Sequence, residues 1–145
     1  MKKAILTDII AALFILLFIY AAMAKLIDYT NFQLQLAKSP LIGSLAGIVA
    51  WIIPTIEIII SVLLSMRRFR LQGLFAGFSL MVMFTAYIIA ITAFSEFIPC
   101  SCGGILSRMG WSQHLLFNLC FVLLAIAGIL LYSDPVTKKL ISLPI

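Results

Sequence analysis

The chain has 145 residues, of which 64% are hydrophobic and only 10% are charged, and its formal net charge is +5 at pH 7. So few polar side chains cannot cover the surface of a water-soluble domain, and no basic stripe suited to nucleic acid is present. The composition therefore excludes a soluble enzyme and predicts an integral membrane protein.

Four apolar blocks are long enough to cross a bilayer, at residues 5–24, 41–66, 71–94 and 115–132. Backbone polar groups must be satisfied within a membrane-spanning element, and these runs lack the alternating pattern of barrel strands, so they predict helices. We expect an all-α integral membrane protein, a four-transmembrane-helix bundle that forms one domain over residues 1–145.

Lys and Arg are distributed unevenly among the segments that connect these blocks. Seven of the ten basic residues lie in the N-terminal tail, the connection after the second block and the C-terminal tail. By the positive-inside rule, both termini face the cytoplasm and the loop at residues 95–113 is extracytoplasmic, as in a multi-pass protein of the bacterial inner membrane. We expect the excess positive charge to contact anionic lipids.

A short amphipathic segment follows the first block. Tyr29, Phe32 and Leu36 have the spacing of residues on one helix face, and Ser39 precedes Pro40, which disfavours helical geometry. We expect a short helix that lies in the membrane interface and ends before the second block.

The second block contains Pro54 and Glu57 deep within its apolar run. An ionised carboxylate is costly there, so Glu57 either remains protonated or has a partner inside the bundle. Pro54 leaves the carbonyl of Ala50 without its usual donor and favours a kink. The two residues predict an irregular polar spot, and Glu57 is either a packing hydrogen-bond donor or acceptor or a proton or ligand site.

Gly73 and Gly77 in the third block form a small-xxx-small pair. Such a pair permits close contact between helices, and ordinary packing is the favoured explanation.

The segment that precedes the fourth block, FIPCSCGGILSRMG, contains Cys100 and Cys102 on the oxidising side of the predicted topology. A disulfide across one intervening residue forms a tight, strained ring, and strained exposed disulfides exchange readily. The pattern favours a catalytic or relay pair. Two alternatives are that the pair only shapes the loop, and that Cys100 and Cys102 bind Cu(I) or Zn(II), with His114 as a third ligand.

Two further residues are auxiliary candidates. Cys120, inside the fourth block, is expected to be a buried apolar thiol, with a resolving cysteine as the alternative. His114, at the start of that block, is expected to be an interfacial polar residue, with stabilisation of a thiolate at Cys100 or Cys102 as the alternative.

All three cysteines lie in or near the outer half of the predicted bundle. Thiol exchange alone cannot carry electrons to the cytoplasm, because that transfer needs thiols at both faces. The pair must therefore exchange with an exported thiol protein, with a membrane quinone, or with both.

Three segments, AKLIDYTNF, WIIPTIEIIISVLL and IPCSCGGILSRMGW, resemble the MauE/DoxX-like family of membrane proteins over essentially the whole chain. The resemblance implies a four-helix inner-membrane protein that assists maturation of methylamine dehydrogenase, with Cys100 and Cys102 as its redox pair. The arrangement, a four-helix bundle with a cysteine pair outside the membrane, is also similar to the vitamin K epoxide reductase and DsbB-type bundles, which pass electrons to quinone. This chain departs from those bundles because it lacks their second loop-borne pair and their CxxC spacing.

We therefore expect a thiol–disulfide oxidoreductase or redox accessory protein that exchanges disulfides with an exported thiol protein or a thioredoxin-like protein. A quinone is the one cofactor considered. The alternatives from other classes are a Cu- or Zn-handling membrane protein and a structural subunit of a membrane complex. A homo-oligomer is a further expectation.

Overall fold

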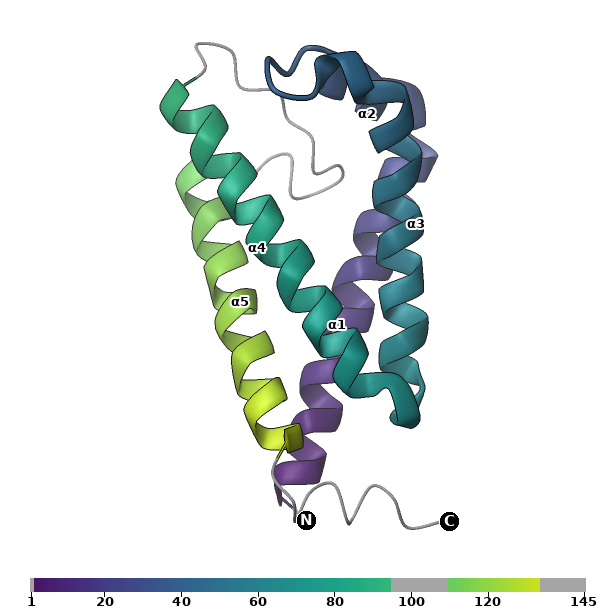
Figure 1. The fold of residues 1–145 in the computed structure, drawn as a ribbon, viewed down its shortest axis with the longest axis vertical. Helices are drawn as coiled ribbons and strands as arrows, with labels where there is room; N and C mark the ends of the chain where they lie inside the picture. Colours follow the sequence, from purple (N-terminus) through teal and green to yellow (C-terminus); the bar gives the residue numbers. More distant parts are fainter. Residues whose placement is uncertain (1, 95–109, 134–145) are drawn as a thin grey trace.

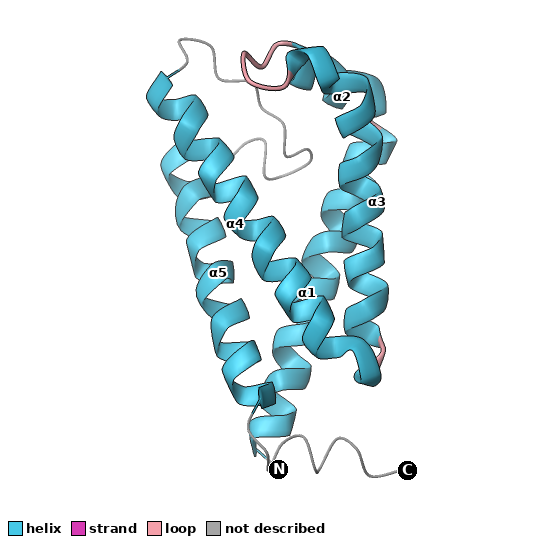
Figure 2. Ribbon diagram, viewed as in Figure 1, coloured by secondary structure: helices cyan, strands magenta, loops and turns pink. Residues whose placement is uncertain are grey.

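The computed structural model describes residues 2–94 and 110–133, and every element in these ranges is helical. Figures 1 and 2 show long helices joined by short turns. In chain order the elements are α1 (Lys2–Ile27), α2 (Tyr29–Ala37), η1 (Gly43–Leu45), α3 (Ala46–Ser65), η2 (Arg67–Phe69), α4 (Arg70–Phe94) and α5 (Trp111–Ser133).

Four helical segments have the length and composition to cross a membrane: Lys2–Ile27, Gly43–Ser65, Arg67–Phe94 and Trp111–Ser133. These segments confirm the four predicted blocks to within a few residues. The four helices form a ring, in which α1 packs against α3 and α5, and α4 packs against the same two helices from the other side. The short helix α2 lies across one end of the bundle, and the N-terminus lies at the other (Figure 1).

Aromatic and aliphatic side chains fill the interior, which is centred on Phe14 and Phe18 of α1, Ile60 and Leu64 of α3, and Leu74 of α4. The outer faces are equally apolar, and many of their large hydrophobic side chains are exposed. A surface of this kind is stable in lipid and not in water. The protein is therefore a multi-pass membrane protein in a lipid bilayer.

The helix α2 confirms the predicted amphipathic segment. Phe32 and Leu36 are buried and pack with Ala46 and Ala50 of α3. Ser39, just beyond the helix, is also buried and accepts a hydrogen bond from the Tyr87 hydroxyl of α4 at 2.9 Å. The connection between α1 and α3 is thereby fixed to the end of the bundle.

Gly73 and Gly77 confirm the prediction of close packing between helices. A Cβ atom at Gly73 would lie 3.0 Å from the backbone nitrogen and the side chain of Leu64 on α3. One at Gly77 would lie 3.3 Å from the ring of Phe18 on α1. Both glycines therefore let α4 approach its neighbours more closely than a larger residue would allow.

Candidate functional site

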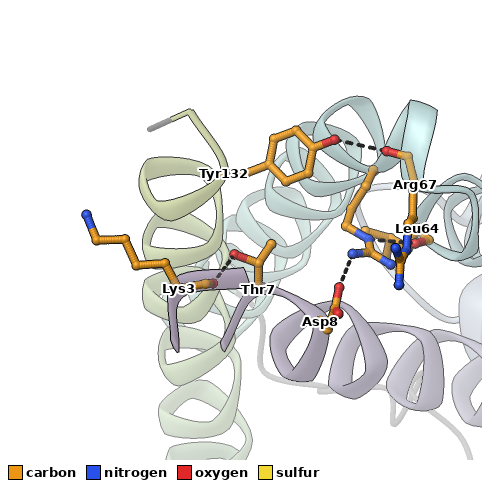
Figure 3. Close-up of polar contacts among 7 residues, drawn as sticks. Lys3, Thr7, Asp8, Leu64, Arg67 and Tyr132 are labelled. Atoms are coloured by element: carbon orange, nitrogen blue, oxygen red, sulfur yellow. Dashed lines mark hydrogen bonds and ion pairs between the residues drawn. The ribbon is translucent and has the colours of Figure 1, made fainter. Parts of the chain in front are cut away.

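The end of the bundle that contains the N-terminus carries most of the described basic residues. These are Lys2, Lys3, Arg67, Arg68 and Arg70. Arg70 is buried, forms an ion pair with Asp8 of α1 and donates from Nε to the carbonyl oxygen of Leu64 at 3.3 Å (Figure 3). A single guanidinium group thus links α4 to both α1 and α3.

Two more hydrogen bonds stabilise this basic end. The Tyr132 hydroxyl of α5 donates to the carbonyl oxygen of Arg67 at 2.9 Å, and the buried Thr7 donates to the carbonyl oxygen of Lys3 at 2.9 Å (Figure 3). The Tyr132 bond joins α5 to the turn before α4. This end of the bundle is therefore a structural anchor, and its polar groups bond to one another.

A buried ion pair lies deeper in the bundle. Nζ of Lys25 on α1 is 2.7 Å from Oε1 of Glu57 on α3, and the two side chains are 4% and 0% exposed. The Lys25 ammonium also donates to the carbonyl oxygen of Ala21 at 3.4 Å and lies 5.9 Å and 5.8 Å from the ring centroids of Phe32 and Phe84. The ion pair thus lies among apolar and aromatic side chains.

Of the two predicted states of Glu57, the structure supports the one with a partner inside the bundle. Sequence reasoning did not identify the partner, because Lys25 lies 32 residues before Glu57 and on another helix. The available signal was one Lys at the end of the first apolar block and one Glu within the second. Ionisable residues in membrane segments usually pair with one another.

The helix α5 contributes His114 and Asn118, one turn apart on its inner face and 5% and 4% exposed. Both border a cavity of about 30 Å³ that Lys25 and Glu57 also border. His114 lies in the first turn of the helix, as predicted, and its side chain is directed into the bundle. The expectation that it is an interfacial polar residue stays a prediction. Sequence reasoning missed Asn118, although the spacing of four residues from His114 places them on one helix face.

These four side chains, Lys25, Glu57, His114 and Asn118, are called the polar cluster below. Two of its atoms, Oε2 of Glu57 and Nδ2 of Asn118, are buried and have no hydrogen-bond partner among the described residues. The cluster can hold a proton, a water molecule or a polar group of a ligand between three helices.

Pro54 is buried within α3, three residues before Glu57. The helix continues through it from Ala46 to Ser65, so the predicted irregular spot does not interrupt the helix. The carbonyl of Ala50 is still without the amide donor that any other residue at position 54 would provide.

Cys120 is an exposed free cysteine on the outer surface of α5, so the expectation of a buried thiol is wrong. The helical pattern of α5 explains the difference: Asn118 faces the bundle, and two residues further along the helix the side chain points away from it. The alternative role of Cys120 as a resolving cysteine stays a prediction.

Cys100 and Cys102 lie outside the described residues. Within residues 2–94 and 110–133, no group of three or more His, Cys, Asp and Glu side chains has the arrangement of a metal site. The alternative of a metal site at Cys100, Cys102 and His114 includes residues outside these ranges and stays untested, as does the role of His114 beside a thiolate.

A larger cavity of about 280 Å³ lies between α2, α3 and α4. Its lining is almost entirely apolar and includes Ile53, Leu80 and Phe84, with Lys25 at one border. Lys25 therefore borders both cavities, and among the described residues that line the apolar cavity it is the only charged one.

No curated protein sequence and no solved structure shows significant similarity to the chain. A protein-family model described as "Methylamine utilisation protein MauE" matches residues 3–131, which include all four membrane-spanning helices almost completely. A match over this length, together with the four-helix membrane architecture, establishes that the chain belongs to the MauE family.

Proposed function

We propose that this MauE-family protein is an inner-membrane thiol–disulfide accessory protein, in which Cys100 and Cys102 exchange disulfides with an exported partner. The observation that supports it best is the polar cluster, which lies inside an otherwise apolar bundle. Polar and ionisable groups are costly in a membrane and usually mark functional sites.

The bundle's charge distribution supports an extracytoplasmic position for the cysteine pair. Phe94 ends α4 and Trp111 begins α5, and these helix ends flank the sequence that contains Cys100 and Cys102. Both ends lie away from the basic end that carries Arg67 and Arg70 (Figure 1). The positive-inside rule assigns the basic end to the cytoplasm and the cysteine-containing connection to the oxidising side.

The exchange proceeds through a thiolate. A thiolate of one molecule attacks the disulfide of the other and forms a mixed disulfide, and the second cysteine of the attacking pair then releases it. The pair that supplied the two thiols becomes a disulfide, and the other disulfide becomes two thiols, so two electrons pass between the proteins. A thioredoxin-like protein or a maturing exported protein of the methylamine pathway is the proposed partner.

A membrane quinone is the proposed small-molecule acceptor. The cavity of about 280 Å³ fits the head of a quinone, because Ile53, Leu80 and Phe84 provide apolar walls and Lys25 provides an N–H donor for a carbonyl oxygen. When bound, a quinone supplies two-electron acceptor chemistry. The role of the chain's own residues is to bind the head of that molecule, to orient one carbonyl towards Lys25 and to exclude water.

Trapping of the mixed disulfide tests the proposal. A Cys102→Ser variant should retain a covalent partner through Cys100, or a Cys100→Ser variant should retain one through Cys102, as a reducible adduct on a non-reducing gel. Cys120→Ser is the matched control, and it should give no adduct because both loop cysteines remain. A failure of both single variants to capture any partner would contradict the exchange reaction.

A second measurement separates exchange from a structural role. If the protein is only a subunit of a membrane complex, replacing Cys100 and Cys102 together by serine would leave maturation of the exported partner intact. The exchange mechanism predicts that the double variant loses maturation while the amount of the protein in the membrane is unchanged.

A further inference from the structure

Two residues that border the small cavity of the polar cluster each have one unsatisfied polar atom, and they lie on different helices. Oε2 of Glu57 on α3 is a hydrogen-bond acceptor, and Nδ2 of Asn118 on α5 is a donor. Both atoms are buried, and both residues border the same cavity of about 30 Å³. A buried polar atom without a partner costs about 1 to 3 kcal/mol, so two such atoms in one cavity indicate a missing third group.

The cavity has room for a water molecule. A cavity holds one water molecule when the centre of a water-sized sphere can move within roughly 10 to 15 Å³. The observed volume of about 30 Å³ is sufficient for a water molecule.

The charges and hydrogen-bonding groups around the cavity select a neutral molecule. The ammonium of Lys25 and the carboxylate of Glu57 compensate each other at 2.7 Å, so neither an added cation nor an added anion is favoured. The unsatisfied atoms need a partner that both accepts a hydrogen bond from Asn118 and donates one to Glu57. Water does both.

We propose that the polar cluster binds one internal water molecule, which accepts a hydrogen bond from Nδ2 of Asn118 and donates one to Oε2 of Glu57. The water joins Glu57 of α3 to Asn118 of α5. Since Lys25 already links α1 to α3, the water extends this polar network across three helices. The water is not a reactant in the thiol exchange proposed above, so a failure to find it and a failure to trap a mixed disulfide are separate results.

Side-chain NMR of the whole protein in lipid nanodiscs provides a direct test. The chain has only two asparagines, Asn31 and Asn118, so ¹⁵N-asparagine labelling gives two side-chain amides. Asn31 is exposed and serves as the internal control for exchange with bulk water. We expect a cross peak from the Asn118 amide protons to a bound water; its absence, with the Asn31 peak present, would overturn the proposal.

An Asn118→Leu variant tests the same proposal through the sign of a stability change. If the water is present, the variant removes it and leaves Glu57 Oε2 without a partner, so the unfolding midpoint falls. If the cavity is dry, the variant removes an unsatisfied donor and fills space with an apolar side chain, so the midpoint rises. Thr85→Val is the matched control, because Thr85 is buried but bonds only to the carbonyl of Met81 in its own helix at 2.8 Å.

The NMR cross peak and the unfolding midpoint are independent measurements, and only the second requires that the variant folds. Should Asn118→Leu give no folded protein, the NMR measurement on the unaltered chain still decides the question. A rise in the unfolding midpoint of Asn118→Leu above that of the unaltered protein would count against the water, whatever the control shows.

Discussion

The buried ion pair between Lys25 and Glu57 leads to a prediction about stability. Single substitutions should lower the free energy of unfolding, and the double substitution should leave it unchanged or raise it. At the observed 2.7 Å, two unit charges attract by about 6 kcal/mol at an effective dielectric constant of ~20. This attraction offsets the cost of removing both groups from water, so the net contribution of the pair is much smaller.

Removing one partner leaves the other without compensation. Lys25→Met leaves the Glu57 carboxylate buried in the bundle, and Glu57→Leu leaves the ammonium among the Phe32 and Phe84 rings. We expect each single substitution to lower the free energy of unfolding by about 3 to 5 kcal/mol.

The double variant Lys25→Met/Glu57→Leu removes both charges at once. We expect its stability to lie between that of the unaltered protein and a gain of about 1 to 4 kcal/mol. Unfolding of the detergent-solubilised protein by SDS, followed by circular dichroism, measures all three variants. Thr55→Val on the exposed face of α3 is the control, since Thr55 bonds only to the carbonyl of Trp51 in its own helix.

The signs of these effects decide whether the pair acts as a unit. If Glu57→Leu alone is as stable as the unaltered protein, or if the two single effects add in the double variant, the ion pair is not the dominant interaction at this position and the reasoning is refuted.

Three further predictions concern other parts of the bundle. Gly73→Val places a side chain against the backbone of Leu64, and we expect a loss of about 1 to 3 kcal/mol by the same SDS assay; an unchanged midpoint would show that α3 and α4 are not in close contact. Arg70→Gln breaks the ion pair with Asp8 and weakens the bond to the Leu64 carbonyl, with an expected loss of about 1 to 3 kcal/mol that is absent if the ion pair does not form. In a variant that keeps Cys120 as its sole cysteine, a charged, impermeant maleimide should label the protein after denaturation in SDS but not in intact membranes. The reason is that the thiol faces lipid, about 14 Å along α5 from its first residue. Equal labelling before and after denaturation would contradict that position.

The long apolar runs and the helical spacing of apolar residues were sufficient to predict the architecture. Runs of roughly 20 apolar residues leave no alternative to helices in a bilayer, since each backbone polar group must bond within its own segment. The amphipathic spacing of Phe32 and Leu36 predicted α2 in the same way, because a helical period of 3.6 residues fixes which side chains share a face. The family resemblance and the four helices are both confirmed.

The candidate site was only partly predictable. Glu57 and His114 were identified because polar residues are rare in apolar segments. The residues that surround them in the bundle were not predicted. The burial of Cys120 was predicted wrongly and the inward direction of His114 was not predicted, because the mean hydropathy of α5 does not reveal which of its faces is internal. The rotation of each helix about its axis decides this, and that rotation depends on contacts with the other three helices.

By itself the sequence determined that this protein has four helices long and apolar enough to cross a membrane, because backbone polar groups must be satisfied within each segment in lipid. Only the tertiary structure decided that Lys25 is the partner of Glu57, 32 residues away along the chain, and that both border one small cavity with His114 and Asn118. The physical reason is that a buried charge pairs with an opposite charge that is close in space, and the order of the helices around the bundle determines which groups are close.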